Sequence, residues 1–280
     1  MHVTTLAKAI SIPLAIALGS CTMAVKAKRA DRVLHAIETA APASLDIETR
    51  NGAVSVEEDP GIAEMQIQVD YTAGGRDEYE AEERVELFDL DITQGAGGTY
   101  SIRIDPPGGW QNGDGAKLRV IVPEAGEVRV RTSNGSILVK GASGEMVLDT
   151  SNGRVATEDT TGELQISTSN GSVQLQGHRG PLDAETSNGS MKLFVPAGST
   201  SPFELQTSNG SIQVGLSEGW AGRVSAHTSN GTIRYLSGGQ EVSRSKDKQV
   251  VKIGDANETS SVRTSNGSVT IQVTGKVTGL

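Results

Sequence analysis

The residues of this 280-residue chain that could carry out catalysis are carboxylates on segments of alternating polarity. Hydrolysis of a glycoside needs two carboxyl groups at a fixed separation. Acidic side chains recur at the polar positions of successive segments; they are Glu127, Glu145, Asp149, Glu163, Asp183, Glu185 and Glu204. None of them differs from its equivalents in neighbouring segments, and basic and amide residues lie between them. This pattern favours a solvated face of mixed charge, with a polysaccharide-active enzyme as an alternative.

Metal and nucleophile chemistry has little support in the sequence. The four histidines are far apart, and the single cysteine, Cys21, excludes a disulfide framework and a cysteine zinc cluster. An acidic segment could bind calcium weakly, although its composition is more typical of a solvated loop; its acids are Asp77, Glu78, Glu80, Glu82 and Glu83. We therefore expect no metal, no cofactor and no enzymatic activity.

The overall composition points to a repetitive, non-nucleic-acid-binding protein. Asp and Glu outnumber Lys and Arg by 34 to 25, whereas a nucleic-acid binder normally has a basic face. Only 3% of the residues are aromatic and 34 are glycine, so a core must repeatedly bury small aliphatic side chains. Trp110 and Trp220 lie beside glycines in turn-rich segments, where they could stack on sugars or cap a sheet edge.

The N-terminal segment has the pattern of an export signal. Lys8 precedes an apolar run of ten residues at 9–18, which is too short to span a membrane and has the length of a signal-peptide core. The following Leu18-Gly19-Ser20-Cys21 resembles the lipobox of bacterial lipoproteins, in which the cysteine is lipidated. We therefore expect residues 1–20 to be a lipoprotein signal peptide and residues 21–32 to provide lipid attachment at Cys21 and a tether. By the same resemblance, Thr22 after the cysteine implies the outer membrane in a Gram-negative cell.

The remainder of the chain is built from a repeat, which is the strongest signal in the sequence. The motif Thr-Ser-Asn-Gly occurs seven times, and Thr49-Arg50-Asn51-Gly52 is an eighth, outlying copy. The asparagines are Asn51, Asn134, Asn152, Asn170, Asn188, Asn209, Asn230 and Asn266. From Asn134 onward they are 18, 18, 18, 21, 21 and 36 residues apart. Because 36 is twice 18, we expect one unit to have lost its motif near the polar insertion at 237–248.

Each unit reads as two half-buried strands joined by the Asn-Gly motif. Positions 6, 4 and 2 residues before the asparagine and 3 and 5 residues after it are mainly apolar or Thr, with polar residues between them. Leu138, Val147 and Phe194 are apolar exceptions in the polar phase. A meander of hairpins would also use Asn-Gly turns, but recurrence of the same residue types favours stacked, parallel rungs. We expect Asn and Gly to form structural corners, with the glycine at positive φ. The hydroxyl of the inward Thr should form hydrogen bonds either along a ladder of Thr side chains or with the corner backbone.

Taken together, these segments resemble the bacterial DUF4097 or "toast-rack" family of adhesin-like envelope proteins. The resembling elements are Ile47–Val54 (IETRNGAV), Leu118–Pro123 (LRVIVP) and the serial Thr-Ser-Asn-Gly rungs, which together extend over roughly residues 33–275. The resemblance implies a β-solenoid located outside the cytoplasm and supplies no catalytic residues.

The sequence as a whole therefore predicts an all-β protein with a two-sheet β-solenoid of ~18-residue rungs at residues 33–280. Within it, we expect residues 62–123 to be an irregular elaboration and residues 124–275 to be regular repeats. The predicted function is a non-enzymatic, lipid-anchored cell-envelope protein, either an adhesin-like binder or a structural β-rod. Its partners would be the membrane, through the lipid, and an unknown envelope protein or glycan, but no nucleic acid. A periplasmic stress-sensing or scaffold partner is the alternative within the same fold.

Overall fold

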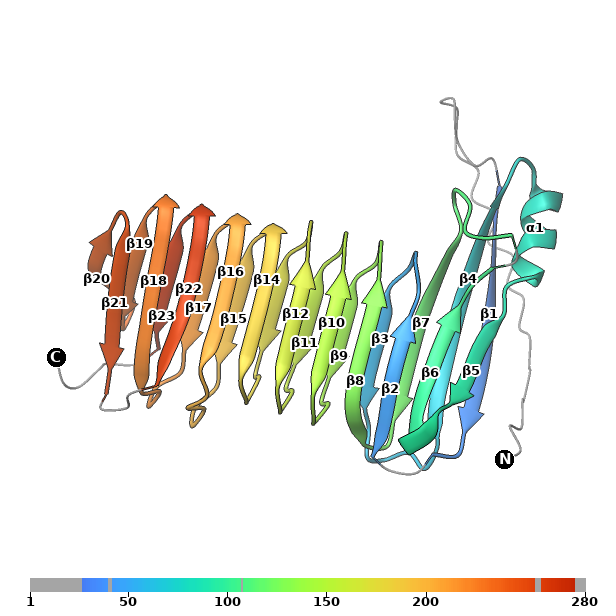
Figure 1. Ribbon diagram of the computed structural model, residues 1–280, viewed down its shortest axis with the longest axis horizontal. Coiled ribbons are helices and arrows are strands. Elements are labelled where there is room, and N and C mark those ends of the chain that lie inside the picture. Colours follow the sequence, from blue (N-terminus) through green and yellow to red (C-terminus); the bar gives the residue numbers. More distant parts are fainter. Residues whose placement is uncertain (1–26, 40–41, 107, 255–257, 275–280) are drawn as a thin grey trace. The chain divides into compact units, whose positions relative to one another are not determined.

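The computed structural model describes residues 27–39, 42–106, 108–254 and 258–274, which form two compact units (Figure 1). Unit 1 extends to Gly135 and unit 2 begins at Ser136. The predicted signal peptide and Cys21 lie outside the described residues. The predicted single domain at 33–280 is therefore divided between two units, each of which has strands in two sheets, A and B.

Unit 2 consists of two stacked rows of strands. In spatial order, sheet A contains β9 (Ile137–Lys140), β11 (Val155–Glu158), β13 (Val173–Gln176), β15 (Met191–Val195), β17 (Ile212–Leu216), β23 (Val269–Val273), β19 (Ile233–Ser237) and β20 (Gln240–Ser245). Sheet B contains β10 (Met146–Thr150), β12 (Leu164–Thr168), β14 (Leu182–Asn188), β16 (Phe203–Asn209), β22 (Thr259–Asn266), β18 (Gly222–Asn230) and β21 (Lys248–Ile253).

The strands of successive rungs pair in parallel at equivalent residues, as the repeat predicts. Leu164 lies opposite Leu182 and Thr168 opposite Thr186, and the same one-to-one register continues in sheet A from Val173 to Met191. A meander of hairpins would instead give antiparallel pairs between consecutive strands. The β-solenoid is thereby confirmed, and each rung contributes one strand to each sheet.

The core of unit 2 lies between the two sheets and is filled by the predicted inward positions. Leu148, Leu164 and Leu205 are completely buried, and their outward neighbours are exposed or half-buried. Burial of one such side chain stabilises the fold by about 1.5–3 kcal/mol. Because every rung contributes several of them, the unit builds a core with few aromatic residues.

The last rung in the sequence is not the last rung in space. Strands β22 and β23 pair with β16 and β17 on one side and with β18 and β19 on the other. Along the sequence, β20 and β21 follow β19 and precede β22. Strand β20 pairs antiparallel with β19, and β21 pairs antiparallel with β18. A pair of strands without the motif thus lies near 237–248, as we expected, but these strands pair antiparallel instead of stacking in parallel. Antiparallel strands at the edge of each sheet have no equivalent corner to stack and need no Asn-Gly motif.

Glycines at the Asn-Gly corners of unit 2 are required by close stacking and not by positive φ, whereas Gly52 in unit 1 has the expected positive φ, 138°. Gly171, Gly189, Gly210 and Gly267 do not have the left-handed backbone that we expected. A Cβ on Gly210 would instead collide with the carbonyl oxygen of Gly189, and the same holds between other neighbouring corners. The stacked carbonyl oxygens also accept the inward Thr hydroxyls, as from Thr207 Oγ1 to Gly189 O at 3.1 Å. Corner backbone, and not a Thr ladder, therefore satisfies most of these buried hydroxyls.

Some of the corner hydroxyls remain unsatisfied. Thr186, Thr228 and Thr264 donate to corner glycine carbonyls at 2.8–3.2 Å. Within the described residues, the hydroxyls of Thr49 and Thr168 have no hydrogen-bond partner. Their neighbours in the stack hold the corner geometry despite the cost of burying an unpaired hydroxyl.

The corner asparagines form a continuous amide ladder along unit 2. Each Nδ2 donates to the Oδ1 of the neighbouring rung at 2.9–3.0 Å, and the ladder runs through Asn152, Asn170, Asn188, Asn209, Asn266 and Asn230 in that order. In unit 1, Asn134 donates to Asn51 at 2.8 Å. The order follows the spatial sequence of rungs, so the side chains stabilise the stack wherever two corners meet.

Unit 1 carries the irregular elaboration predicted for residues 62–123. Its part of sheet A contains, in spatial order, β1 (Ala27–Ile37), β4 (Met65–Gly75), β7 (Gly115–Val122) and β3 (Val54–Glu58). Its part of sheet B contains β5 (Leu90–Gln94), β6 (Thr99–Ile104), β2 (Ala43–Glu48) and β8 (Ala125–Thr132). A short 3-10 helix, η1 (Ala96–Gly98), precedes β6.

Strand β1 overlaps the segment 21–32 that we expected to be a tether. Residues 27–32 pair antiparallel with β4, from Ala27 opposite Gly75 onward. An edge strand needs only backbone hydrogen bonds on one side, so polar residues join the sheet without the alternation that would reveal a strand.

The acidic segment near residue 80 forms a helix, α1 (Glu78–Glu86), which contacts β4 and β1. Asp77 caps its N-terminus by accepting from the Glu80 backbone, and Ala81 is buried. Arg84 Nη2 lies 2.6 Å from Asp114 Oδ2, and the Asp114 side chain also accepts from the Gly74 backbone. This largely buried ion pair fastens the helix to the sheet.

Close stacking at the corners predicts that Gly210→Ala is more destabilising than Asn209→Ala. The alanine methyl group would press on a carbonyl that the neighbouring rung holds in place, which typically costs about 1–3 kcal/mol or more. The asparagine change removes exposed amide bonds, each contributing about 1 kcal/mol. Urea unfolding followed by circular dichroism would measure both variants.

Gly95→Ala provides the matched control, because Gly95 has φ −80° and its nearest neighbouring atom would lie 3.7 Å from a Cβ. Stability of Gly210→Ala equal to or above that of Asn209→Ala would contradict the stacking explanation.

Candidate functional site

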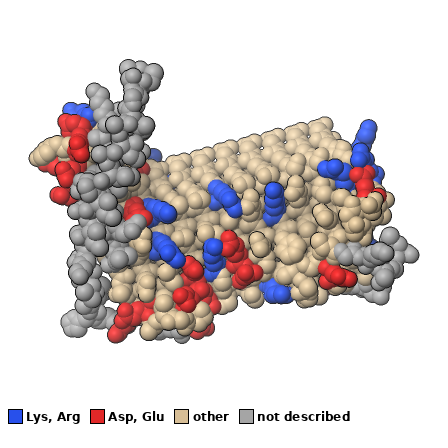
Figure 2. Space-filling model, turned by 180° about the vertical axis from the view of Figure 1, so that it is seen from behind, with Lys and Arg blue, Asp and Glu red and all other residues tan. Residues whose placement is uncertain are grey.

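The two outer faces of unit 2 differ in charge. On sheet B, the acids of the predicted set lie on successive strands, with Asp183 directly opposite Glu204. On the parallel strands of sheet A, the charged outward residues are Lys140, Arg154, Glu158, Lys192 and Arg234. Sheet A is therefore basic in a chain of net charge −9. In Figure 2, Lys and Arg side chains are scattered over a largely uncharged face.

The acids that could have formed a catalytic pair make ordinary surface contacts. Glu204 accepts from Arg263 at 2.9 Å, and Glu127 of unit 1 accepts from Arg129 at 2.8 Å. Glu163 and Glu185 accept side-chain amide hydrogens from Gln165 and Gln206. Glu163, Asp183 and Glu204 border a shallow depression of about 250 Å³. Asp149, Asp183 and Glu185 border a smaller one of about 170 Å³.

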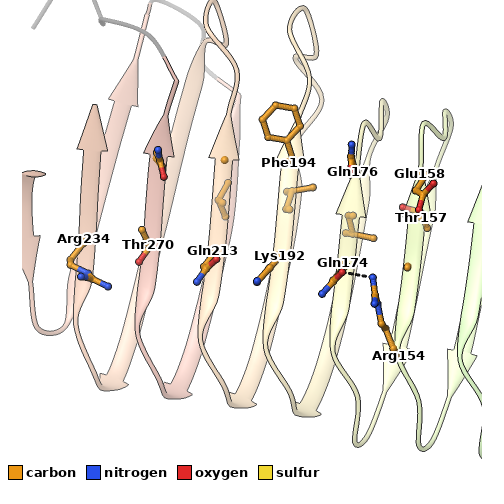
Figure 3. A pocket seen from close by; sticks show the side chains of 16 residues that line it. Arg154, Thr157, Glu158, Gln174, Gln176, Lys192, Phe194, Gln213, Arg234 and Thr270 are labelled. Carbon is orange, nitrogen blue, oxygen red and sulfur yellow. Dashed lines mark hydrogen bonds between the residues drawn. The ribbon is translucent and has the colours of Figure 1, made fainter. Parts of the chain in front are cut away.

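A larger depression, of about 480 Å³, lies on the outer face of sheet A (Figure 3). It crosses the parallel strands β11, β13, β15, β17, β23 and β19. One-to-one register places its side chains in two straight rows. The amide–cation row is Ala156, Gln174, Lys192, Gln213, Thr270 and Arg234. The Phe194 row is Glu158, Gln176, Phe194, Gly215, Gln272 and Leu236.

The positive charges of these rows are largely uncompensated. Arg154, at the end of the amide–cation row, donates through Nη2 to the Gln174 side-chain oxygen. Within the described residues, Lys192 forms no ion pair, whereas Arg234 interacts electrostatically with the Glu241 carboxylate of the adjacent strand β20, which is itself paired with Arg244. The single acid of the rows, Glu158, is held by Lys140 at 2.6 Å. The rows can therefore offer cations to a ligand without first breaking a salt bridge.

Phe194 places an aromatic ring on the lining of the depression, above Lys192 in Figure 3. It is 43% exposed, whereas the other aromatic residues of the described part of unit 2, among them Phe203 and Tyr235, are buried. Its ring leans over Gly215 on the neighbouring strand, where a Cβ would approach ring atom Cδ2 to 3.1 Å. The glycine thus makes room for the ring against the sheet surface.

Neither tryptophan takes part in this surface. Trp220 is 4% exposed and packs against Phe203, with ring centroids 6.4 Å apart. Trp110 in unit 1 meets Phe88 edge to face at 6.0 Å. Trp220 packs on Phe203 of β16, which is an interior strand of sheet B, so these contacts show neither of the two roles that the sequence left open.

The two histidines of unit 2 have unlike surroundings. His227 is half-exposed and lies 3.2 Å from Asp247. His178 is buried in the turn between β13 and β14, where its Nδ1 lies 3.0 Å from the Thr160 hydroxyl. Burial lowers the pKa of His178, outweighing hydrogen bonds to the backbone of Pro181, Gly180 and Thr160, which raise it. The folded protein therefore favours the neutral imidazole.

This burial predicts that His178 destabilises the fold as the pH falls. Below its unfolded-state pKa of about 6.5, the unfolded chain binds a proton that the native state resists. Native stability is therefore full above about pH 6.5 and decreases below it, by at most about 1.4 kcal/mol per pH unit. The measurement is the difference in unfolding free energy between the unmodified chain and His178→Gln, from pH 8 to about pH 5.

Because other groups also titrate in this range, the difference between the two chains is the quantity to follow. A difference that stays constant with pH, or that grows in favour of the unmodified chain under acid conditions, would show that the imidazole accepts its proton in the folded state.

Sequence reasoning missed the two rows as a site. It noted Phe194 as an apolar exception in the polar phase, and this exception was the available signal. Neighbouring residues within a row are 18 to 57 positions apart along the chain. Thr270 lies between Gln213 and Arg234 only because the last rung is inserted there.

The described residues lack a metal-ligating cluster and a membrane-spanning helix. In that part of the chain, no group of three or more His, Cys, Asp or Glu is arranged to hold a metal ion. No helix among the same residues is both long and apolar enough to cross a membrane. The acids Asp77 and Glu80 instead take part in the cap and an ion pair of α1.

Several solved structures resemble this chain at low identity. A "putative cell adhesion protein" from Clostridium sporogenes is 11% identical, with a TM-score of 0.39, and the match covers 88% of this chain and all of the other. A "putative adhesin" from Bacteroides fragilis is 12% identical, with a TM-score of 0.43 and coverage of 86% and 96%. A "putative lipid binding protein" from Parabacteroides distasonis is 13% identical, with a TM-score of 0.39 and coverage of 88% and 94%.

Among curated protein sequences, none matches the chain. The model of the family described as Toastrack DUF4097 matches residues 27–272, which include every strand of both units except the last residue of β23. The chain belongs to the Toastrack DUF4097 family.

Proposed function

We propose that this protein is a non-enzymatic, lipid-anchored protein of the cell envelope that binds an extended partner along the outer face of sheet A in unit 2. The observation that carries the proposal is the pair of rows, in which an exposed aromatic ring and unpaired cations lie in register on six parallel strands. Such a surface makes many weak contacts along a partner rather than enclosing a small molecule.

The chemistry of the depression supports binding over catalysis. General acid–base chemistry needs a titratable group within hydrogen-bond reach of the reacting atom. The one carboxylate of the rows, Glu158, is engaged by Lys140. The amides of Gln174 and Gln213 can hold hydroxyl and carbonyl groups but do not exchange protons in the neutral range.

Anchoring in the membrane rests on the N-terminal sequence. Cys21 follows the apolar run and the lipobox-like Leu18-Gly19-Ser20, and it is the single cysteine of the chain. A lipid on this residue would hold the binding units at a membrane surface, which is the outer membrane if the cell is Gram-negative. Stable anchoring takes more than one acyl chain.

Lipidation predicts that Cys21→Ser moves the protein from the membrane fraction to the soluble fraction. Metabolic labelling with an alkyne-tagged fatty acid should label the unmodified chain and leave the serine variant unlabelled. Ser20→Ala, which keeps the thiol, is the control and should remain labelled and sedimenting. Fatty-acid labelling of Cys21→Ser would contradict anchoring at this residue.

Binding along sheet A predicts that a bulky group on this face blocks retention on isolated cell envelopes. A Gln213→Cys chain in the Cys21→Ser background offers one thiol for polyethylene glycol maleimide at the centre of the amide–cation row. Gln206→Cys on the outer face of sheet B is the control, since both positions are exposed.

We expect the label at 213 to abolish envelope retention and the label at 206 to leave it intact. Equal retention of both labelled chains would exclude sheet A as the binding face. Absence of retention for the unlabelled chain would favour a scaffold or stress-sensing role.

A further inference from the structure

We propose that the amide–cation row and the Phe194 row bind an unbranched polysaccharide that carries carboxylate groups, laid across the strands of sheet A. This inference rests on the proposed binding function and names its ligand class. Three features of the face carry it: the length of the rows, their uncompensated cations, and the combination of amides with an aromatic ring.

The length of the rows calls for a polymer. They cross six parallel strands, which at about 4.8 Å per strand is a distance of about 24 Å. The two rows are separated by two residues along each strand, about 6.6 Å. A ligand that contacts both rows along this distance is therefore narrow, extended and several monomers long.

The cations select negative charge on that polymer. Lys192 and Arg234 are three strands apart in the amide–cation row, about 14 Å. Arg154 adds a third cation at the β11 end. Glu158 is the one acid that lines the depression, and it is paired with Lys140. Each exposed ion pair is weak, but charges spaced along one chain act together because the later contacts are intramolecular.

The amides match hydroxyl groups. Gln174, Gln213, Gln176 and Gln272 lie between or beside the charged residues, and the last three are exposed. Each carries a donor and an acceptor, which suits a sugar hydroxyl that can both give and receive a hydrogen bond. Arg154 occupies the oxygen of Gln174 and leaves its amide hydrogens available.

The aromatic ring distinguishes a sugar from a simple polyanion. Phe194 leans over Gly215 between Gln176 and Gln272, with its ring partly open to solvent. The C–H face of a pyranose is apolar and can bury itself on such a ring, whereas a carboxylate gains nothing there. A ring between amides and above a row of cations thus fits an acidic glycan.

Other anionic partners fit less well. Nucleic acids are usually held by many phosphate contacts, and this depression offers three cations in a chain of net charge −9. A lipid surface would need a wider apolar patch than the single exposed ring. An acidic peptide would use the cations but leave the four amides and the ring without matched partners.

Three polymers and the purified full-length chain in detergent test the proposal. Polygalacturonate carries sugar and charge, its methyl-esterified form carries the same sugar backbone without the charge, and polyglutamate carries charge without sugar. Surface plasmon resonance would measure binding of each at several salt concentrations. We expect polygalacturonate to bind at least tenfold more tightly than the other two polymers.

Variants of the rows test the two interactions separately. Phe194→Ala should weaken polygalacturonate binding about tenfold, the loss typical of one aromatic stacking contact. Its control is Tyr79→Ala, which removes a 70% exposed aromatic residue in unit 1. The double variant Lys192→Gln/Arg234→Gln should weaken binding and flatten its salt dependence, whereas Arg223→Gln on sheet B should change neither.

Each other outcome overturns the inference in a different way. Equal affinity for polyglutamate, or full binding by Phe194→Ala, would show that the face recognises charge alone. Equal affinity for the esterified polymer would assign it to neutral glycans. If none of the polymers binds while the label at position 213 still blocks envelope retention, the glycan assignment fails and the proposed binding function stands. If that label has no effect, the proposed function itself fails.

Discussion

Stacking of one corner backbone directly on the next is the constraint on which the rest of the structure depends. Each corner glycine leaves no room for a Cβ beneath the following rung, so neighbouring rungs meet at equivalent residues. Zero-shift register follows in both sheets. It aligns the asparagines into a hydrogen-bonded ladder and the inward aliphatic residues into continuous layers. The outer faces are aligned by the same register, which is why residues distant in sequence lie in straight rows.

The features of the fold that recur in every rung could be predicted from the sequence. The inward phase of Leu148 or Leu164 is visible because the pattern recurs in every rung, and positional equivalence separates stacked rungs from hairpins. The order of rungs was not predictable, because identical corners at Asn209, Asn230 and Asn266 can stack in any order. Nor was the role of the corner glycines, which the sequence suggested to be a matter of positive φ. In unit 2 the backbone conformation of these corners does not require glycine, but the close approach of the neighbouring rung does.

The candidate binding face could be predicted only in fragments. Lys192 and Phe194 appear in the sequence as two outward residues on one short strand, where a solvated surface is the simpler interpretation. Their meaning depends on neighbours from other rungs: Gly215 makes room for the ring, and Gln174 and Gln213 flank the lysine. The absence of competing acids around Lys192 is likewise a property of the assembled face. Periodicity reveals which side of the sheet a residue occupies, while pairwise proximity has to come from the structure.

Insertion of the last rung connects folding with this face. Thr270 of β23 lies between Gln213 of β17 and Arg234 of β19, so the amide–cation row is continuous only after the C-terminal strands have entered. Until then, β16 and β17 present open edges, and the rung of β18 and β19 has no partner on that side. Pairing between segments far apart in the sequence slows folding, because loop closure has to precede the contacts that stabilise it. A protein whose C-terminal rung has not inserted therefore lacks the complete binding surface as well as the complete fold. The hydrogen bonds that join β23 to β17 and β19 also bring the residues of each row into alignment.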